Sequence, residues 1–158
     1  MDKLSSSTIV KIGIVTNDIF DTVERYKRLF HLKEDPVISV PDPEHPKPTA
    51  PGAYKRYKGQ DYKIMLKAAH VDLDPIYLEI LEPFDETPSP WLDHLKKYGT
   101  SICFISFYVD GFQHEIDLME KEGYPEIFEE EKGFERYAYF DTLEKLGLTI
   151  ELKERGEK

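Results

Sequence analysis

Alternating apolar and polar positions at the start of the chain predict a strand that leads into a helix. In "IVKIGIV" (residues 9–15) the apolar side chains of Val10, Ile12 and Ile14 alternate with Lys11 and Gly13, as in a half-buried strand. The following segment, 19–32, repeats apolar residues at helical spacing after a polar Asn-Asp pair that can cap a helix. The pattern therefore places a lysine in the middle of a strand, on the face away from the helix.

Residues 33–99 alternate between irregular and extended segments. Six of the eleven prolines lie between Pro36 and Pro51, which predicts a loop or a lid with at most a short edge strand. Two extended segments follow at 54–70 and 75–83, with Gly59 near a turn in the first. Segment 85–99 reads as a linker with a short helix, and Gly99 lies just past the end of that helix.

The strand and helix pattern then starts again. Residues 101–111 predict a strand, 112–124 a helix, 134–142 a strand and 148–154 a closing strand. Between these elements, "EIFEEEK" (126–132) is interpreted as a solvated acidic edge. The repeat predicts one domain, 1–158, built from a first βαβββ module (8–84), the linker (85–99) and a second βαβββ module (100–153). Two such modules can bury a sheet face together.

Periodicity assigns four side chains to the strand faces that turn away from the helices: Lys11, Glu79, Phe104 and Glu151, one on each opening and closing strand. A buried charge is costly unless it is paired or used. We therefore expect these side chains to face one polar cleft, with Glu79 or Glu151 as the partner of Lys11. By the same periodicity, three more side chains are candidates for ligand contact: Tyr77, Ser106 and Tyr108.

Composition narrows the choice of partners. The net charge of −10 argues against a nucleic acid or an anionic membrane surface, since both attract basic proteins. The short basic stretch around Arg56 could still hold a small anionic ligand. The sequence contains a single cysteine, no membrane-length apolar run and no signal-like segment, so we expect a cytoplasmic protein.

These segments, in this order, resemble the vicinal oxygen chelate superfamily, which includes glyoxalase I, methylmalonyl-CoA epimerase, extradiol dioxygenases and the bleomycin resistance proteins. The similar stretches are "KIGIVTNDIFDTVERYKRLFHL", "YLEILEPFDETPSPWLDHLKKYGTSICFISFYVD" and "YAYFDTLEKLGLTIEL". The second is most similar to the glyoxalase and epimerase branch. The resemblance implies an α+β fold of paired βαβββ modules, whose curled sheet encloses a cleft.

The resemblance also implies where a metal would be bound. Members that use a divalent metal carry one ligand on each opening and closing strand, usually His on the opening strands and Glu or Gln on the closing ones. In this chain those positions hold Lys11, Phe104, Glu79 and Glu151. An ammonium group and a phenyl ring have no free lone pair for a metal. We therefore expect either no cofactor or a Mg²⁺ or Mn²⁺ ion bound weakly by Glu79 and Glu151.

Three functions remain open from the resemblance. The first is an enzyme like glyoxalase (lactoylglutathione lyase) or methylmalonyl-CoA epimerase, which moves a proton next to the carbonyl of a small carbonyl compound or thioester. Glu151 or Glu79 would be the base, and Lys11 would replace the metal. The second is a non-catalytic protein that sequesters a small molecule, as bleomycin resistance proteins do. The third is a non-catalytic subunit. The resemblance also implies a homodimer, with the modules paired either within one chain or across the dimer.

Overall fold

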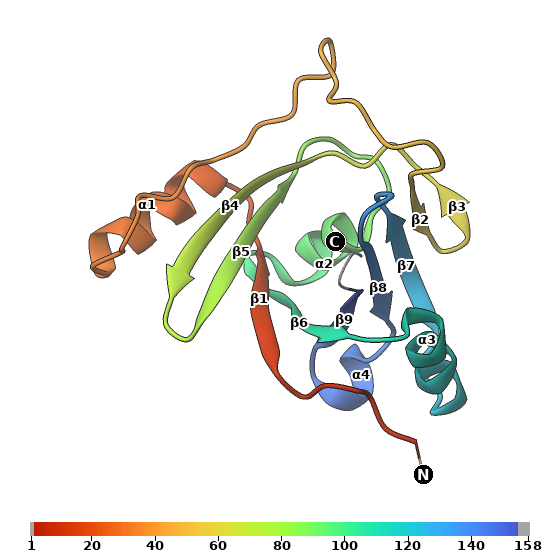
Figure 1. The fold of residues 1–158 in the computed structure, drawn as a ribbon. Helices are drawn as coiled ribbons and strands as arrows, with labels where there is room; N and C mark the ends of the chain where they lie inside the picture. Colours follow the sequence, from red (N-terminus) through yellow and green to blue (C-terminus); the bar gives the residue numbers. More distant parts are fainter. Residues whose placement is uncertain (1, 155–158) are drawn as a thin grey trace. The chain divides into compact units, whose positions relative to one another are not determined.

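A computed structural model describes residues 2–154 of the chain. Within that range it has nine strands and four helices, which confirms the α+β class. In chain order they are β1 (Ile9–Val15), α1 (Ile19–Leu29), β2 (Tyr54–Tyr57), β3 (Gln60–Asp61), β4 (Leu66–Leu73), β5 (Ile76–Pro83), α2 (Pro90–Tyr98), β6 (Ser101–Val109), α3 (Phe112–Lys121), β7 (Glu126–Glu131), β8 (Arg136–Phe140), α4 (Leu143–Leu146) and β9 (Thr149–Glu154) (Figure 1).

The chain forms two compact units, each described here by itself. Unit 1 comprises 1–10, 48–63 and 104–158, and unit 2 comprises 11–47 and 64–103. In each unit an opening strand lies parallel to a closing strand, while the two predicted modules, 8–84 and 100–153, stay a prediction. In unit 2 this pair is β1 with β5, and in unit 1 it is β6 with β9.

Unit 2 is a three-stranded arrangement, β1-β5-β4, with α1 packed on one face. The helix begins where the Asp18 side chain accepts a hydrogen bond from the backbone N–H of Asp21, as the capping pair predicted. Ile19 and Val23 of the helix pack on the apolar strand residues Ile14, Val71, Leu78 and Ile80. The alternate residues of these strands, among them Lys11 and Glu79, lie on the opposite face.

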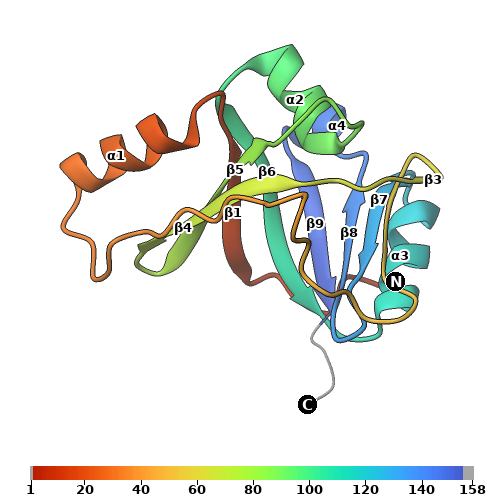
Figure 2. The same ribbon diagram turned by 90° about the horizontal axis from the view of Figure 1, so that it is seen from above.

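Unit 1 has the strand order β3-β2-β7-β8-β9-β6. Helix α3 packs on one face of it through Phe112, Ile116 and Met119, against apolar residues of β6, β8 and β9 (Figure 2). Phe107, Val109 and Leu152 lie under this helix, as periodicity predicted. The other face carries Phe104, Ser106 and Glu151.

The acidic segment 126–132 was wrongly interpreted as a solvated edge. Residues 126–131 form β7, which pairs with β2 on one side and β8 on the other. Phe128 is only 1% exposed, and the glutamates of the strand are half-buried. This strand therefore lies inside the sheet of unit 1, where its partner strand β2 comes from residues far away in sequence.

Residues 31–53 connect α1 to β2 without a regular helix or strand, as the prolines predicted (Figure 1). This connection is fixed near its middle in unit 2 by a bridge between Ser39 and Ala68. Near its end, in unit 1, Ala50 lies close against Gly133, where a Cβ would come within 2.5 Å of the Cβ of Ala50. Gly133 also has a positive φ of 94°, which favours glycine. The role of a lid over a cleft stays a prediction.

Candidate functional site

The opening lysine of unit 2 is paired. Lys11 is buried, and its Nζ lies 3.2 Å from Oε2 of Glu79. Glu79, one of the two partners that the sequence left open, is therefore a partner of Lys11 in the structure. His70 lies opposite Glu79 in the antiparallel β4–β5 ladder, and its Nε2 is also 3.2 Å from Oε2 of Glu79. Three side chains from three adjacent strands thus meet at one carboxylate oxygen.

The two partners of Glu79 change its acidity. Burial alone would raise the pKa of this carboxyl, but hydrogen bonds from His70 and Lys11 and the Lys11 charge outweigh burial and lower the pKa to about 2. Glu79 is therefore ionised at neutral pH. It is also a weak base, because a general base works best with a pKa near the working pH.

In unit 1 a second carboxylate is held by a neutral donor. Ser106 and Glu151 are register partners on the parallel strands β6 and β9, and both are buried. The Ser106 hydroxyl donates to Oε1 of Glu151 over 2.6 Å. Such a short bond to a carboxylate is strong and fixes the side-chain rotamer.

Aromatic residues share the strand face of this carboxylate. Tyr139 is the register partner of Glu151 on β8, and its ring centroid lies 5.0 Å from that of Phe104 and 5.4 Å from that of Phe128. Lys153, two positions after Glu151 on the same face of β9, lies over the ring of Tyr108 at 5.3 Å.

Sequence reasoning missed several residues of this face: Phe128, Tyr137, Tyr139 and Lys153. The ammonium of Lys153 also lies 5.1 Å from the ring centroid of Tyr137 and 3.0 Å from a carboxylate oxygen of Glu135. Burial and a hydrogen bond with Glu135 raise the pKa of Tyr137. The sequence does contain a signal for Tyr137 and Tyr139. They alternate with other residues in "RYAYF", which is typical of two side chains on one strand face, here the face of Glu151.

Of the two remaining candidates, Tyr77 lies beside the Lys11–Glu79–His70 group and Arg56 lies apart from Glu151. Tyr77 of unit 2 contacts the His70 ring, with centroids 4.8 Å apart. Arg56 of unit 1 pairs with Asp61 at 2.8 Å and lies over the ring of Tyr54. The ladder from β2 through β7 and β8 to β9 puts Arg56 on the face of Leu152, opposite that of Glu151. The ligand-binding roles of Tyr77 and Arg56 stay predictions.

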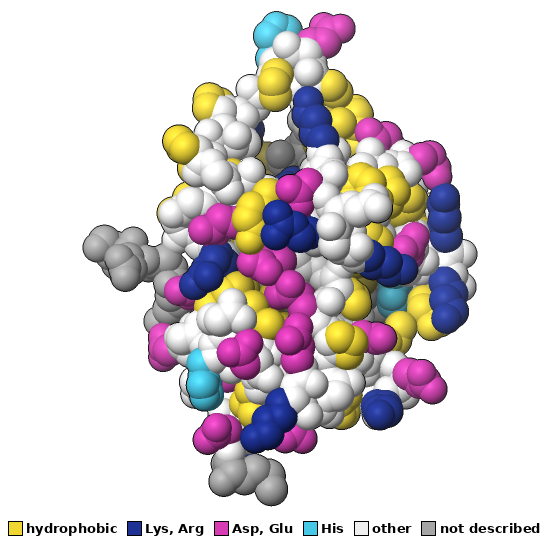
Figure 3. Space-filling model, turned by 90° about the vertical axis from the view of Figure 1, so that its right-hand side faces the viewer, with side chains coloured by type: hydrophobic (Ala, Val, Ile, Leu, Met, Phe, Trp, Pro, Cys, Tyr) yellow, Lys and Arg dark blue, Asp and Glu magenta, His cyan; other side chains and the backbone are white. Residues whose placement is uncertain are grey.

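Acidic side chains gather on the part of the surface that carries β2, β7 and α3 (Figure 3). Among them Glu126 has its pKa raised to about 8, because it is partly buried and shares a hydrogen bond with Glu129. Tyr54 donates to Glu129 at 2.8 Å, and burial together with this bond raises the pKa of Tyr54 to about 12. Strand β7, which carries Glu126 and Glu129, contains none of the site residues predicted from the sequence.

The donor set does not fit the four-ligand metal centre that the family resemblance implies. Lys11 and Phe104 offer no lone pair at the two opening positions, and Oε2 of Glu79 is already bonded to Lys11 and His70. Within residues 2–154, no three side chains of His, Cys, Asp and Glu are placed to hold a metal ion together. Weak binding of Mg²⁺ or Mn²⁺ by the two glutamates stays a prediction.

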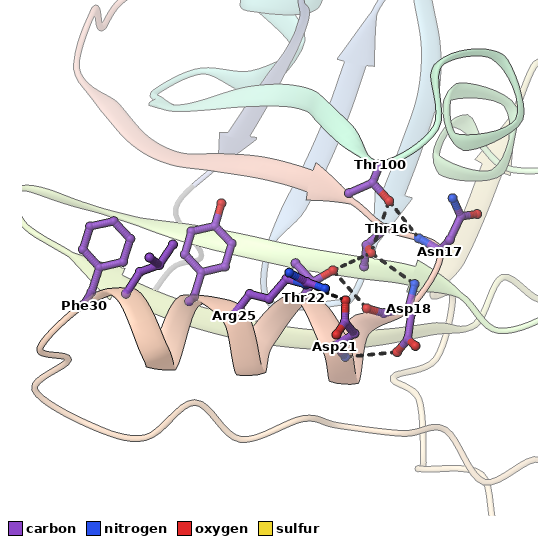
Figure 4. Close-up of a pocket in the computed structure, with 10 residues that line it drawn as sticks. Thr16, Asn17, Asp18, Asp21, Thr22, Arg25, Phe30 and Thr100 are labelled. Atoms are coloured by element: carbon purple, nitrogen blue, oxygen red, sulfur yellow. Dashed lines mark hydrogen bonds and ion pairs between the residues drawn. The ribbon is translucent and has the colours of Figure 1, made fainter.

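A groove of about 620 Å³ runs along α1 in unit 2 (Figure 4). At one end Thr16 bonds to Thr22 at 2.7 Å and Thr100 to Thr16 at 3.4 Å, and at the other end Tyr26 stacks on Phe30. The threonine hydroxyls thus bond to one another, and none of the site residues predicted from the sequence lines the groove.

No helix among the described residues is long and apolar enough to cross a membrane.

Three features can be compared with known families. They are the repeated order of strands and helices, the parallel pairing of opening and closing strands, and the charged residues at the strand positions. The family model of the glyoxalase/bleomycin resistance protein/dioxygenase superfamily matches residues 11–140. The chain therefore belongs to this superfamily, which confirms the resemblance found in the sequence.

Solved structures are similar to this chain in fold. Methylmalonyl-CoA epimerase from Mycobacterium tuberculosis superposes with a TM-score of 0.62 at 15% identity, covering 99% of this chain and 93% of that one. A Streptomyces coelicolor methylmalonyl-CoA epimerase variant in complex with 2-nitronate-propionyl-CoA gives a TM-score of 0.62 at 21% identity, with 98% and 99% covered. At these identities the likeness shows the fold alone. Comparison with curated protein sequences returned no match.

Proposed function

We propose that the protein moves a proton next to the carbonyl of a small carbonyl or thioester metabolite, without the metal centre of its relatives. The observation that carries this proposal is the buried Glu151, held by the short bond from Ser106 among aromatic rings. A fixed carboxylate in such surroundings is suited to remove a proton from a weakly acidic carbon. Glu79 is not suited, because its pKa is lowered to about 2.

Removal of that proton leaves negative charge on the carbonyl oxygen, which must be stabilised by a positive charge or a hydrogen-bond donor. The proposal gives this role to the Lys11 ammonium, at the position where relatives carry a metal ligand. Its pairing with Glu79 holds it in place. That Lys11 and Glu151 serve one ligand follows from the repeat and is part of the proposal.

The test is exchange of the α-proton in D₂O, followed by ¹H NMR, with a panel of thioesters and α-keto compounds. Methylmalonyl-CoA heads the panel because the similar structures are epimerases of that compound, followed by propionyl-CoA and the hemithioacetal of methylglyoxal. Exchange that falls at least about 100-fold in Glu151→Gln supports the proposal, a loss expected for a general base. A double-mutant cycle with Lys11→Met then measures whether the two residues act on the same step.

A second candidate is sequestration of a small molecule without chemistry. The cation–aromatic group of Lys153, Tyr108 and Tyr137 favours it, since such groups bind ligands through their faces and charge. Calorimetry on the same panel separates the two. Binding without exchange supports sequestration, and exchange supports the enzyme. Light scattering tests the expected homodimer, and the cytoplasmic location stays a prediction.

A further inference from the structure

The groove along α1 is a cavity of unit 2 that the proposed function does not use. Its volume of about 620 Å³ is within the range of small-molecule sites in proteins. Thr22, Arg25 and Phe30 project from the same side of the helix and line the groove (Figure 4). The lining continues from one end of this 11-residue helix to the other, so the groove is roughly 16 Å long. These dimensions fit an elongated small molecule.

The end of the groove at the start of α1 offers hydrogen-bond acceptors. Two of the backbone N–H groups that begin the helix already bond to carboxylates, because Ile19 donates to Glu82 and Asp21 donates to Asp18. A further anion is therefore disfavoured at this helix N-terminus. The side chains of Asn17, Asp18 and Asp21 are exposed there and line the groove. A ligand group that donates hydrogen bonds suits this end best.

The charge of the groove favours a cation in that place. Two acids, Asp18 and Asp21, and one base, Arg25, line the groove, so it is negatively charged. Nε of Arg25 lies 2.8 Å from Oδ2 of Asp21, and both side chains are more than half exposed. Because such an exposed ion pair contributes little free energy, a cation of a ligand can compete with Arg25 for Asp21.

The other end of the groove is apolar and open to solvent. The rings of Tyr26 and Phe30 stack with 6.2 Å between their centroids. The Leu29 side chain is 76% exposed and that of Phe30 is 46% exposed. An apolar chain that covers these side chains removes apolar surface from water, which is favourable.

We propose that this groove binds an amphipathic amine, a small molecule with an apolar chain and a primary ammonium group at one end. The chain lies on Leu29 and Phe30, and the ammonium donates to the carboxylates of Asp18 and Asp21, which only accept hydrogen bonds. The net charge of −10 of the whole chain adds a long-range attraction for cations. The inference goes beyond the proposed function and does not depend on it.

The test uses three probes with the same eight-carbon chain: octylammonium, octanoate and octyl glucoside. Each is titrated below its micelle concentration into the full chain, and ¹H–¹⁵N NMR follows the backbone signals. We expect octylammonium to bind at least about 5-fold tighter than either of the others, with the largest shifts at Asn17, Thr22 and Leu29. Equal affinity for the three head groups, absence of saturable binding or shifts centred outside the groove would overturn the proposal.

Two substitutions at the polar end test the role of charge. Arg25→Gln removes the cation that competes for Asp21, so we expect the affinity for octylammonium to rise about 2- to 5-fold. A gain of affinity cannot result from damage to the fold. Asp21→Asn should lower the affinity by a similar factor, whereas Glu24→Gln, at an exposed acid of α1 outside the groove, should leave it unchanged. An Arg25→Gln protein that binds octylammonium no better than the wild type contradicts the proposal.

A matched pair of substitutions tests the apolar end. Phe30→Ser removes a lining ring, and we expect the affinity for octylammonium to fall about 3- to 10-fold. Phe20→Ser is the control, because Phe20 is also an exposed phenylalanine of α1 but does not line the groove. Equal losses in the two variants would show that the chain binds elsewhere on the helix and would overturn the proposed site.

Discussion

Glu79 of unit 2 and Glu126 of unit 1 are both partly buried strand glutamates, yet their acidities are opposite. The pKa of Glu79 is lowered to about 2 because His70 and Lys11 outweigh its burial. The pKa of Glu126 is raised to about 8, because burial is reinforced by Glu129 and Glu120. Burial acts in the same direction at both positions. The charge and hydrogen bonding of the neighbouring groups decide the outcome.

The two carboxyls therefore affect stability in different pH ranges. Glu79 stabilises the fold above its ordinary pKa of 4.5, and this contribution is lost as pH falls through about 2. Glu126 is protonated in the fold, so its contribution is complete below pH 4.5 and is lost as pH rises through about 8.

The largest expected effect on stability comes from removing the Lys11 ammonium group of unit 2. Lys11→Ala leaves Glu79 with His70 alone, and we expect a loss of roughly 1–3 kcal/mol in the free energy of unfolding at pH 7. Urea denaturation measures this loss. Lys33→Ala is a matched control, because Lys33 also pairs with an acid, Asp74, but both side chains are exposed. Equal losses in the two variants would contradict the importance that we give to the buried pair.

A smaller loss of stability is expected in unit 1, where the neutral Ser106 hydroxyl bonds to the Glu151 carboxylate. Ser106→Ala removes the donor from Oε1 of Glu151, and a hydrogen bond of this kind contributes about 1 kcal/mol net. Ser101→Ala is the control, because the Ser101 hydroxyl bonds to a half-buried histidine and a backbone carbonyl instead of a buried carboxylate. A Ser106→Ala protein as stable as the wild type would show that Glu151 does not depend on this bond.

Glu126→Gln is expected to make the stability of the fold less dependent on pH. The amide keeps the shape of the side chain but cannot ionise, so the variant should lose less stability than the wild type between pH 5 and pH 9. Because Glu126 is only partly buried, solvent screening limits the difference to under about 1 kcal/mol. Unfolding curves at both pH values measure it. Parallel pH dependence of the two proteins would mean that Glu126 titrates normally.

The last prediction concerns metal affinity instead of stability. Lys11→His together with Phe104→His supplies imidazoles at both opening positions, as in metal-dependent relatives. We expect Ni²⁺ or Zn²⁺ binding at least about 10-fold tighter than in the wild type, measured by calorimetry. Tight binding by the wild type with no gain in the variant would show that the metal is bound through other ligands.

Strand alternation predicted the positions of Lys11 and Glu79 because both lie in strands with clear apolar neighbours. It failed for β7, where four of six residues are glutamate and only Phe128 marks the buried face. Glutamate is uncommon in strands, so local pattern gave no reason to expect one there. The strand exists because β2 and β8 provide pairing on both sides. The extended segment predicted over 54–70 ends at His70, but the hairpin register puts His70 opposite Glu79, inside β4.

The contact between Gly133 and Ala50 bears on how the chain can change length during evolution. Any side chain at position 133 would collide with Ala50, and a positive φ disfavours it independently. Ser39 is likewise tied to Ala68. Between these two fixed points residues 40–49 have no strand partner among the described residues, so insertions and deletions are best tolerated there. Relatives of different length should therefore vary between these points, while the spacing from Ala50 to β2 stays constant.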